Sequence, residues 1–300
     1  MESLAELMQQ YLAELMQQYV EVKGFETLEG IVETDIPGVW FYRSSQGNTR
    51  QPFVYQSGII VLGQGSKNIH IGDHPVRYGA DDYLVVGVPM PLECEAFADD
   101  DKPLLGISVD VPMVLLQQMV QKLEKHGYQN ICSGKEESCG LKSVKMEASM
   151  LNACKRLMRG LCDPLETEVL GQSLLEEVVY RALLSPKGYV LFELAHAEGN
   201  YSRIAQVLDK VHQDYSEPLT VQDLASKANM SISAFHTAFR SVTLESPIQY
   251  IKKVRLNKAR DLIKLEGKRV NDAARLVGYN STSQFSREYK RHFNETPKSA

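Results

Sequence analysis

Two histidines and two glutamates in the first third of the chain are of the types that bind catalytic metals. His70 and His74 stand four residues apart, and Glu93 and Glu95 follow further along. Histidine and carboxylate ligands of this kind hold metals in barrel-shaped enzymes. A Gly-Asp turn signal and Pro75 interrupt the spacing, so the two histidines would not share one face of a strand. We therefore expect no metal, no cofactor and no catalytic residues, and keep a metal-binding enzyme as the alternative function.

Cys94 is the cysteine whose surroundings could give it a chemical role. It lies in the segment MPLECEAF, between Glu93 and Glu95. A sensor of electrophiles or of redox state needs a thiolate, and two neighbouring carboxylates raise the pKa of a thiol. The competing interpretation is a small residue in the wall of a barrel. We keep Cys94 as a candidate sensor, and with it a thiol-based sensing regulator as an alternative function.

The other cysteines bear on the cellular compartment. The chain has five cysteines, an odd number, and no CxxC motif. This usage argues against a disulfide framework and predicts a reducing cytoplasm. Cys132 and Cys139 fall in a loop where transient pairing is conceivable, and Cys154 and Cys162 are predicted core residues. The sequence also contains no apolar run long enough to span a membrane and begins without a signal-peptide pattern.

The last hundred residues contain two similar units, residues 220–247 and 269–297. Ser231 and Phe235 of the first unit recur in the second at an offset of fifty residues. Each unit predicts a helix, a tight turn and a second helix. In both, an Asn or Gly suited to a left-handed turn precedes a serine that can cap the next helix.

The second helix of each unit has an apolar face and a polar face. Phe235 and Phe239 are four residues apart, and so are Phe285 and Tyr289. This helical spacing predicts that each pair faces the core. The opposite faces carry small, polar or basic side chains, which can enter a DNA major groove and contact base edges. We therefore expect DNA contacts from Ser233, His236, Thr237, Arg240, Thr282, Ser283, Ser286, Arg287 and Lys290.

A long amphipathic helix is predicted between the two units, over residues 246–266. It would hold the units apart so that their second helices reach successive major-groove faces, ~34 Å apart along one side of the duplex. The alternative is that the two units bind a partner protein instead of DNA.

The charge distribution supports a nucleic-acid partner although the total does not. The formal net charge is −5. Residues 1–200 hold 16 Lys+Arg and 28 Asp+Glu, a net −12, whereas residues 201–300 hold 17 and 10, a net +7. A basic domain joined to an acidic one is a common pattern in DNA-binding proteins.

The first two thirds of the chain predict β structure followed by helices. Short apolar runs at 59–62, 68–71, 83–88 and 104–109, separated by turn signals, favour a small barrel or sandwich. Helices are predicted over the ranges 113–125, 143–161, 164–183 and 189–196. The expected fold class is α+β, with a barrel in front of an all-α domain.

Three further features of this region bear on function. The octapeptide LAELMQQY occurs twice in tandem, at residues 4–11 and 12–19, and predicts an extended N-terminal helix. A ligand pocket inside the barrel is the default expectation for such an architecture. The single tryptophan, Trp40, could line its mouth, although buried packing is the commoner role of such a residue.

The C-terminal motifs resemble those of AraC/XylS-family transcriptional regulators. The matching segments are MSISAFHTAFRSVT at 230–243, SPIQYIKKVRLNKAR at 246–260 and VGYNSTSQFSREYKRHF at 277–293. They are long and specific. The resemblance implies two helix-turn-helix units in which the polar side chains named above contact bases, and a mainly structural role for Arg255.

The upstream sequence is similar to the branch of that family with a cupin-like N-terminal domain, found beside aldehyde-reductase genes. The matching stretches are 57–65 with Lys67, 81–95 and 188–195.

The resemblance implies a regulator that is not an enzyme. Its expected partners are promoter or operator DNA, an unidentified small-molecule effector and a second copy of the chain, with RNA polymerase as a further candidate. The expected organisation is an effector and dimerisation domain over 1–187, a linker over 188–202 and a DNA-binding domain over 203–300.

Overall fold

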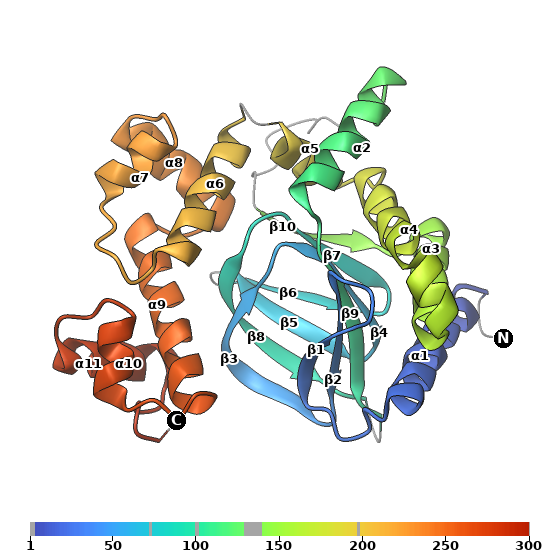
Figure 1. Cartoon of the computed structure of the whole chain (residues 1–300), viewed down its shortest axis with the longest axis horizontal. Helices are drawn as coiled ribbons and strands as arrows, with labels where there is room; N and C mark the ends of the chain where they lie inside the picture. Colours follow the sequence, from blue (N-terminus) through green and yellow to red (C-terminus); the bar gives the residue numbers. More distant parts are fainter. Residues whose placement is uncertain (1–3, 72–73, 100–101, 129–139, 197–198, 300) are drawn as a thin grey trace.

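The computed structural model describes residues 4–71, 74–99, 102–128, 140–196 and 199–299. Within these ranges the chain forms a β-sheet body with helices on one side and a separate group of helices on the other (Figure 1). The architecture is α+β, as the sequence predicts. Cys132 and Cys139 lie outside the described residues.

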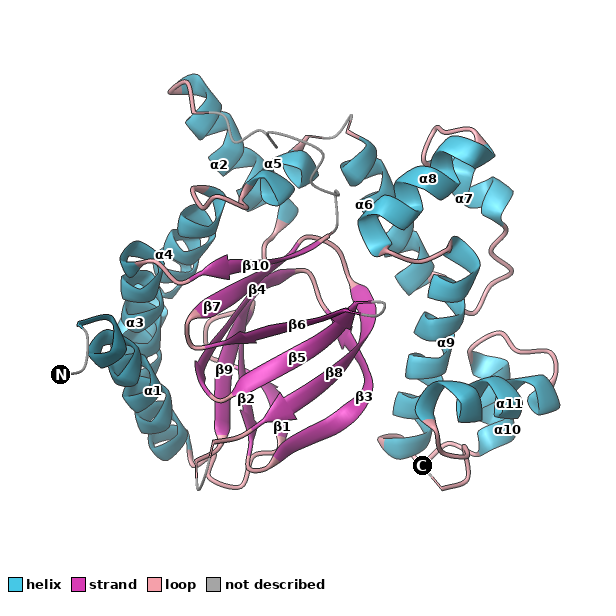
Figure 2. Cartoon of the chain, turned by 180° about the vertical axis from the view of Figure 1, so that it is seen from behind, coloured by secondary structure: helices cyan, strands magenta, loops and turns pink. Residues whose placement is uncertain are grey.

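Two antiparallel sheets face each other and enclose the N-terminal core (Figure 2). The larger has the strand order β1-β2-β9-β4-β7-β10 and the smaller β3-β8-β5-β6. The strands are β1 (Gly30–Glu33), β2 (Val39–Ser44), β3 (Gly47–Tyr55), β4 (Gly58–Gln64), β5 (Ser66–Ile71), β6 (His74–Gly79), β7 (Asp82–Val86), β8 (Met90–Phe97), β9 (Leu104–Val109) and β10 (Leu141–Lys145).

The four strands predicted from apolar runs are confirmed as β4, β5, β7 and β9. The prediction of a helix starting at residue 143 is wrong by one turn. Ser143, Val144 and Lys145 belong to β10, which pairs with β7 at the sheet edge, and the helix begins only at Ala148. Pairing with an available sheet edge outweighs the helical pattern there, because each strand residue gains ladder hydrogen bonds.

Helices cover the outer face of the six-stranded sheet (Figures 1 and 2). These are α1 (Leu4–Lys23), α3 (Ala148–Cys162) and α4 (Pro164–Leu183), while α2 (Met113–Lys125) and α5 (Tyr189–Ala195) lie at one end of the barrel. The duplicated octapeptide forms α1, as predicted, and its second copy carries the buried residues Leu12, Met16 and Tyr19. Asp163 begins α4, because its Oδ1 accepts from the backbone N–H of Leu165 at 2.8 Å.

The C-terminal helices form two units joined by a long helix. The helices are α6 (Asn200–Gln213), α7 (Val221–Lys227), α8 (Ile232–Thr243), α9 (Pro247–Lys264), α10 (Val270–Leu276) and α11 (Thr282–Phe293). Figure 1 shows α7 and α8 beside one end of α9 and α10 and α11 beside the other.

The two units differ in how they join the hydrophobic core. The core of the barrel runs through α5 and α6 into the first unit, and includes Phe235, Phe239 and Val254. The second unit has a small core of its own, around Phe285 and Tyr289. The first unit is therefore packed into the body of the protein, whereas the second is held mainly by α9.

The range 188–202, expected as a linker, contains α5, whose residues Tyr189, Phe192 and Leu194 are buried. The exact domain boundary stays a prediction. Over the described parts of the chain, no helix combines the length and the apolar character needed to cross a membrane.

Candidate functional sites

The first helix-turn-helix unit is built by local signals in its sequence. Thr220 caps α7, because its Oγ1 accepts from the backbone N–H of Asp223 at 3.1 Å. Asn229 takes the left-handed conformation in the turn, with φ of 52°. Ser231 then caps α8 by accepting from the N–H of Ala234 at 3.3 Å. The predicted turn residue and serine cap are confirmed, and they fix the direction of α8.

The second unit repeats this construction with a glycine in the turn. Gly278 has φ of 83°, and a Cβ added there would lie 2.4 Å from the carbonyl oxygen of Ser216. Ser281 caps α11, because its Oγ accepts from the N–H of Gln284 at 3.2 Å. The side chain of Gln284 does not return to the cap, as a capping box would require, and donates to Glu288 instead.

The predicted DNA-facing side chains lie on the surface opposite the buried aromatic residues. Phe235 and Phe285 are fully buried, whereas the predicted contacts are exposed or half-exposed. In the described chain, Arg240, Arg287 and Lys290 make no ion pair with any protein carboxylate. Their charges are therefore available to an external anion. The remaining predicted contacts are Ser233, His236, Thr237, Thr282, Ser283 and Ser286.

Arg255 on α9 ties the two units together. Its Nε donates to Tyr215 O at 2.7 Å and its Nη2 to Glu217 O at 2.8 Å, both in the segment before α7. Its Nη1 approaches the carbonyl of Gly278, in the turn of the second unit, at 3.4 Å. One guanidinium thus fixes the connection into the first unit against the turn of the second, which is the structural role the resemblance implies.

Residues of α9 also dock the C-terminal helical domain onto the barrel. Tyr250 Oη donates to Pro89 O at 2.6 Å and lies 2.8 Å from His212 Nε2. Arg260 Nη2 donates to Pro52 O, on β3, at 3.2 Å. His292 of α11 is half-buried near Glu93, Lys253 and Arg260, and the loss of solvent around its ring lowers its pKa to about 4.

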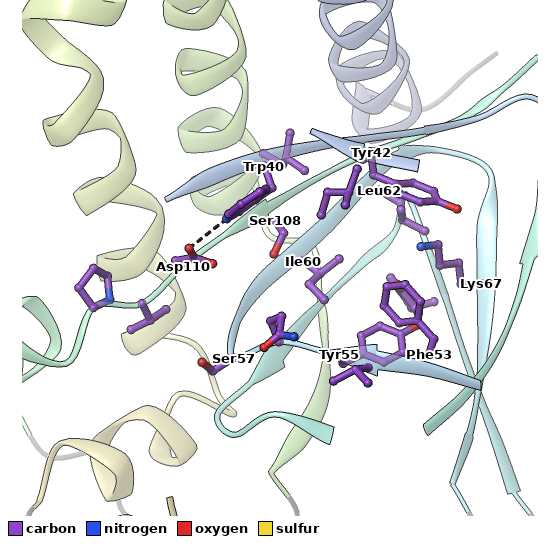
Figure 3. A pocket seen from close by; sticks show the side chains of 18 residues that line it. Trp40, Tyr42, Phe53, Tyr55, Ser57, Ile60, Leu62, Lys67, Ser108 and Asp110 are labelled. Atoms are coloured by element: carbon purple, nitrogen blue, oxygen red, sulfur yellow. Dashed lines mark hydrogen bonds between the residues drawn. The ribbon is translucent and has the colours of Figure 1, made fainter. Parts of the chain in front are cut away.

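A second candidate site is a cavity of about 720 Å³ between the two sheets of the barrel. Its walls come from β1 to β6 and β9, and are largely apolar and aromatic. Figure 3 shows Trp40 and Asp110 at one end of the cavity, and Lys67, Tyr42 and Phe53 at the other. Trp40 Nε1 donates a hydrogen bond to Asp110 Oδ2 at 3.0 Å. The tryptophan lines the pocket, which is the less common of the two roles considered for it. Burial raises the pKa of the Asp110 carboxyl.

Lys67 is the pocket residue whose role sequence reasoning missed. Only 6% of its surface is exposed. A signal for it exists: Lys67 and Ile69 alternate on one face of β5, and Ile69 is fully buried, so the lysine must point inward too.

Cys94 lies in β8, in the barrel wall beside this pocket, and is buried. Burial is the main cause that raises the pKa of its thiol, opposed by the charge of Lys67, while Glu95 makes a smaller contribution. The thiol is therefore protonated at neutral pH. Its reactivity stays a prediction.

Of the residues weighed as metal ligands, His70, Glu93 and Glu95 do not form a ligand set, and the side chain of His74 lies outside what the structure describes. His70 Nε2 lies 3.0 Å from Glu95 Oε2, and Arg50 Nε donates to Glu93 Oε2 at 2.6 Å. Where the chain is described, no group of three His, Cys, Asp or Glu side chains is placed to bind a metal.

Comparison with known families identifies both halves of the chain. A model of the AraC-type transcriptional regulator N-terminus matches residues 35–190, and a helix-turn-helix domain model matches residues 224–300.

Curated relatives match over about a third of the chain. AlkR of Acinetobacter baylyi, an HTH-type transcriptional regulator, is 35% identical over 113 residues, which are 38% of this chain and 35% of that protein. RhaS of Yersinia pestis, an HTH-type transcriptional activator, is 29% identical over 96 residues, which are 32% of this chain and 35% of that protein. The chain thus spans about a third of the length of these relatives.

Solved structures of ToxT from Vibrio cholerae share the fold of nearly the whole chain. One matches with a TM-score of 0.60 and 12% identity, over 87% of this chain and 96% of ToxT. Another, bound to an unsaturated fatty acid, matches with a TM-score of 0.54 and 14% identity, over 86% of this chain and 92% of ToxT. At such identities the likeness concerns the fold alone.

Proposed function

Because the chain belongs to the family of AraC-type transcriptional regulators, we propose that it binds promoter DNA at a specific sequence and changes transcription when the barrel binds a small molecule. The observation that carries the proposal is the pair of capped helices, α8 and α11. Each presents a polar and basic face outward at one end of α9. A regulator of this kind acts in the cytoplasm, where its promoters are.

The DNA contacts of the first unit would come from α8. Ser233, His236 and Thr237 lie on the exposed face near the start of the helix, where recognition helices contact base edges. Arg240 lies a turn further on and has the charge to bind a phosphate or a guanine. A hydrogen bond from Thr237 Oγ1 to Ser233 O, 3.2 Å long, pre-orders this face.

The second unit would make the more strongly basic contact. Thr282, Ser283 and Ser286 offer hydroxyl groups to bases, and Arg287 and Lys290 follow on the same face. Arg291 and the carboxylate of Glu288 lie next to Arg287, but the carboxylate already accepts from Lys252 and Tyr279. Its negative charge is thereby partly compensated, which lowers the repulsion of DNA.

The length of α9 suits two contacts on one face of the duplex. An α-helix of 18 residues is about 27 Å long. With the two units packed beside its ends, their second helices can enter successive turns of the major groove, ~34 Å apart.

The proposal is tested by selecting binding sites from random DNA with the purified full chain. We expect a bipartite site with two half-sites about one helical turn apart, and affinity that falls steeply with salt because phosphate contacts release counterions. The variant with Arg240 and Arg287 both changed to Ala should lose the site and keep its fold by circular dichroism. Absence of any sequence preference in folded protein at low salt would refute the proposal.

Strand β3 offers a route from the pocket to the DNA-facing helices. Phe53 and Tyr55 line the cavity. The backbone carbonyl of Pro52, the residue directly before Phe53, accepts a hydrogen bond from Arg260 on α9. A ligand that shifts Phe53 therefore displaces an anchor of α9. We expect Arg260→Ala to leave effector binding intact and to abolish the effect of effector on DNA affinity. Undiminished coupling in that variant would exclude this route.

A homodimer formed through α4 is the further part of the proposal. Leu165, Val169 and Tyr180 lie on one side of this helix and are 69%, 67% and 37% exposed. Exposed apolar side chains in such a row are typical of a helix that packs on a partner. Sedimentation should give a dimer for the wild type and a monomer for Val169→Glu. RNA polymerase is a further candidate partner, which transcription in vitro with purified polymerase would test.

A further inference from the structure

The inner end of the barrel pocket holds a lysine without a counter-ion. Lys67 extends from β5 into the cavity (Figure 3), and its Nζ lies 3.8 Å from the ring centroid of Tyr42 and 5.6 Å from that of Phe53. The aromatic faces supply partial compensation for its charge. In the described chain no carboxylate pairs with it. An ammonium group buried in this way is costly, and burial lowers its pKa.

Two further polar groups border this cavity. The hydroxyl groups of Tyr55 and Tyr78 are buried beside each other and the Cys94 thiol, and neither meets a carbonyl or carboxylate acceptor within the described residues. Both side chains line the cavity. The nearby Cys94 thiol donates only weakly, to Glu95 O at 3.5 Å. One ammonium group and a pair of adjoining hydroxyls thus border the cavity without a carbonyl or carboxylate acceptor, and buried polar groups in native proteins ordinarily have one.

The rest of the cavity is suited to an apolar body. Ile60 lies between the two ends, Leu62 and Ile107 are further apolar lining residues, and Trp40 lies at the far end. Asp110 lies at that far end, where it accepts from Trp40. A second negative charge on a ligand would be repelled there. With the Lys67 ammonium group at one end of the cavity and the Asp110 carboxylate at the other, a ligand with a single negative charge at one end fits best. This favours a ligand with one carboxylate over a phosphate dianion.

We propose that the barrel binds an amphipathic monocarboxylate, with its carboxylate on Lys67 and the Tyr55 and Tyr78 hydroxyls and its apolar body along β4 and β9. The inference rests on the proposed function, because it names the class of effector that the regulator senses. The carboxylate would accept from the ammonium group and from a neighbouring hydroxyl, and only 6% of the lysine is exposed to solvent there. Such charge-assisted hydrogen bonds are stronger than neutral ones.

The experiment is calorimetric titration of the purified full chain with decanoate and with cis-9-hexadecenoate, each beside its alcohol. We expect both carboxylates to bind at least about tenfold more tightly than the alcohols, which corresponds to 1.4 kcal/mol. Because the chain has one tryptophan, quenching of Trp40 fluorescence reports that the ligand is in this pocket. If neither carboxylate binds, or the alcohols bind as tightly, the proposal is wrong.

Lys67→Met keeps the apolar stem and removes the charge. We expect this variant to bind carboxylate and alcohol with equal affinity, and to melt at a higher temperature than the wild type without ligand, since an unpaired buried charge is gone. The matched control, Lys145→Met, removes an exposed lysine away from the cavity and should bind like the wild type. An unchanged preference for carboxylate in Lys67→Met would overturn the assignment.

DNA binding is measured separately, by fluorescence anisotropy with the selected site. A chain that binds DNA but not carboxylates refutes this inference alone, and a chain that binds carboxylates but no DNA refutes the proposed function alone.

Discussion

Replacing Arg255 with Met should uncouple the two helix-turn-helix units while leaving each one folded. The substitution keeps most of the apolar stem and removes two short hydrogen bonds, to Tyr215 O and Glu217 O, and a longer approach to Gly278 O. A hydrogen bond from a charged donor contributes about 1.5–3 kcal/mol when buried. Arg255 is half-exposed, so we assign about 1 kcal/mol to each short bond and little to the third.

A loss of about 2 kcal/mol corresponds to roughly a thirtyfold change in an equilibrium constant. The equilibrium constant in question is the ratio of molecules in which the second unit has left the angle needed for two half-sites to molecules in which it keeps that angle. We therefore expect Arg255→Met to bind the complete site roughly tenfold to thirtyfold more weakly, and to bind a single half-site like the wild type.

The assay is fluorescence anisotropy with a two-half-site duplex and with a duplex in which the second half-site is scrambled. Arg255→Lys is the matched control, since it keeps the charge that phosphates feel but cannot reach several carbonyls at once. It should lose nearly as much affinity for the complete site as the Met variant. If Arg255→Lys binds like the wild type, or Arg255→Met loses affinity equally for both duplexes, the side chain acts by charge and the argument from geometry is refuted.

Three further changes test other parts of the structure. Arg287→Ala should cost ~1–3 kcal/mol on the selected site and relax the base preference at one position, whereas equal loss on all sequences would show that it contacts only phosphate. Gly278→Ala should lower the free energy of unfolding by at least about 2 kcal/mol, because the added Cβ meets Ser216 O and the backbone φ is left-handed. Asn229→Gly, at the equivalent turn of the first unit, should change the free energy of unfolding by under about 0.5 kcal/mol. Chemical denaturation measures both. Acidification should weaken the docking of the C-terminal helices, since burial lowers the pKa of both His212 and His292 to about 4. The folded state then binds fewer protons than the unfolded state, so the unfolding free energy falls as the pH drops from about 6.5 towards 4, by about 3 kcal/mol per histidine, and melting curves of His292→Gln should show a weaker pH dependence.

The C-terminal units were predictable because their signals are local. The capping side chains are within three residues of the backbone groups that they bind, as Thr220, Ser231 and Ser281 show. The apolar residues spaced four apart, such as Phe285 and Tyr289, lie within one helix. Neither signal depends on residues far away in the chain. The same sequence stretches also carry the family motifs, so pattern and resemblance agree there.

The barrel was only partly predictable because several of its strands break the usual patterns. β3 contains Pro52, which an edge strand tolerates because one side of it needs no ladder partner. β8 contains Pro91 and two glutamates beside buried residues. Pairing between strands far apart in sequence, such as Phe53 with Leu92, defines these elements, and no local window contains it.

The existence of a pocket was expected from the architecture, but most of the side chains that line it could not be predicted, for a related reason. Lys67 meets Tyr42 from β2 and Phe53 from β3, which only the closure of the two sheets brings together. Trp40 and Asp110 are likewise joined by the pairing of β2 with β9. A site made of single residues from many strands leaves no motif in the sequence.

The separate small core of the second helix-turn-helix unit has a consequence for how the protein opens. A cluster held by Phe285, Tyr289 and few other buried side chains can unfold locally while the larger core stays closed. Amide hydrogens of α11 should exchange with solvent faster than those of α8, which belongs to the main core. If the proposed function holds, the protein exists as two populations. One can hold both halves of an operator and the other a single half, and warming shifts the balance toward the second without unfolding the barrel.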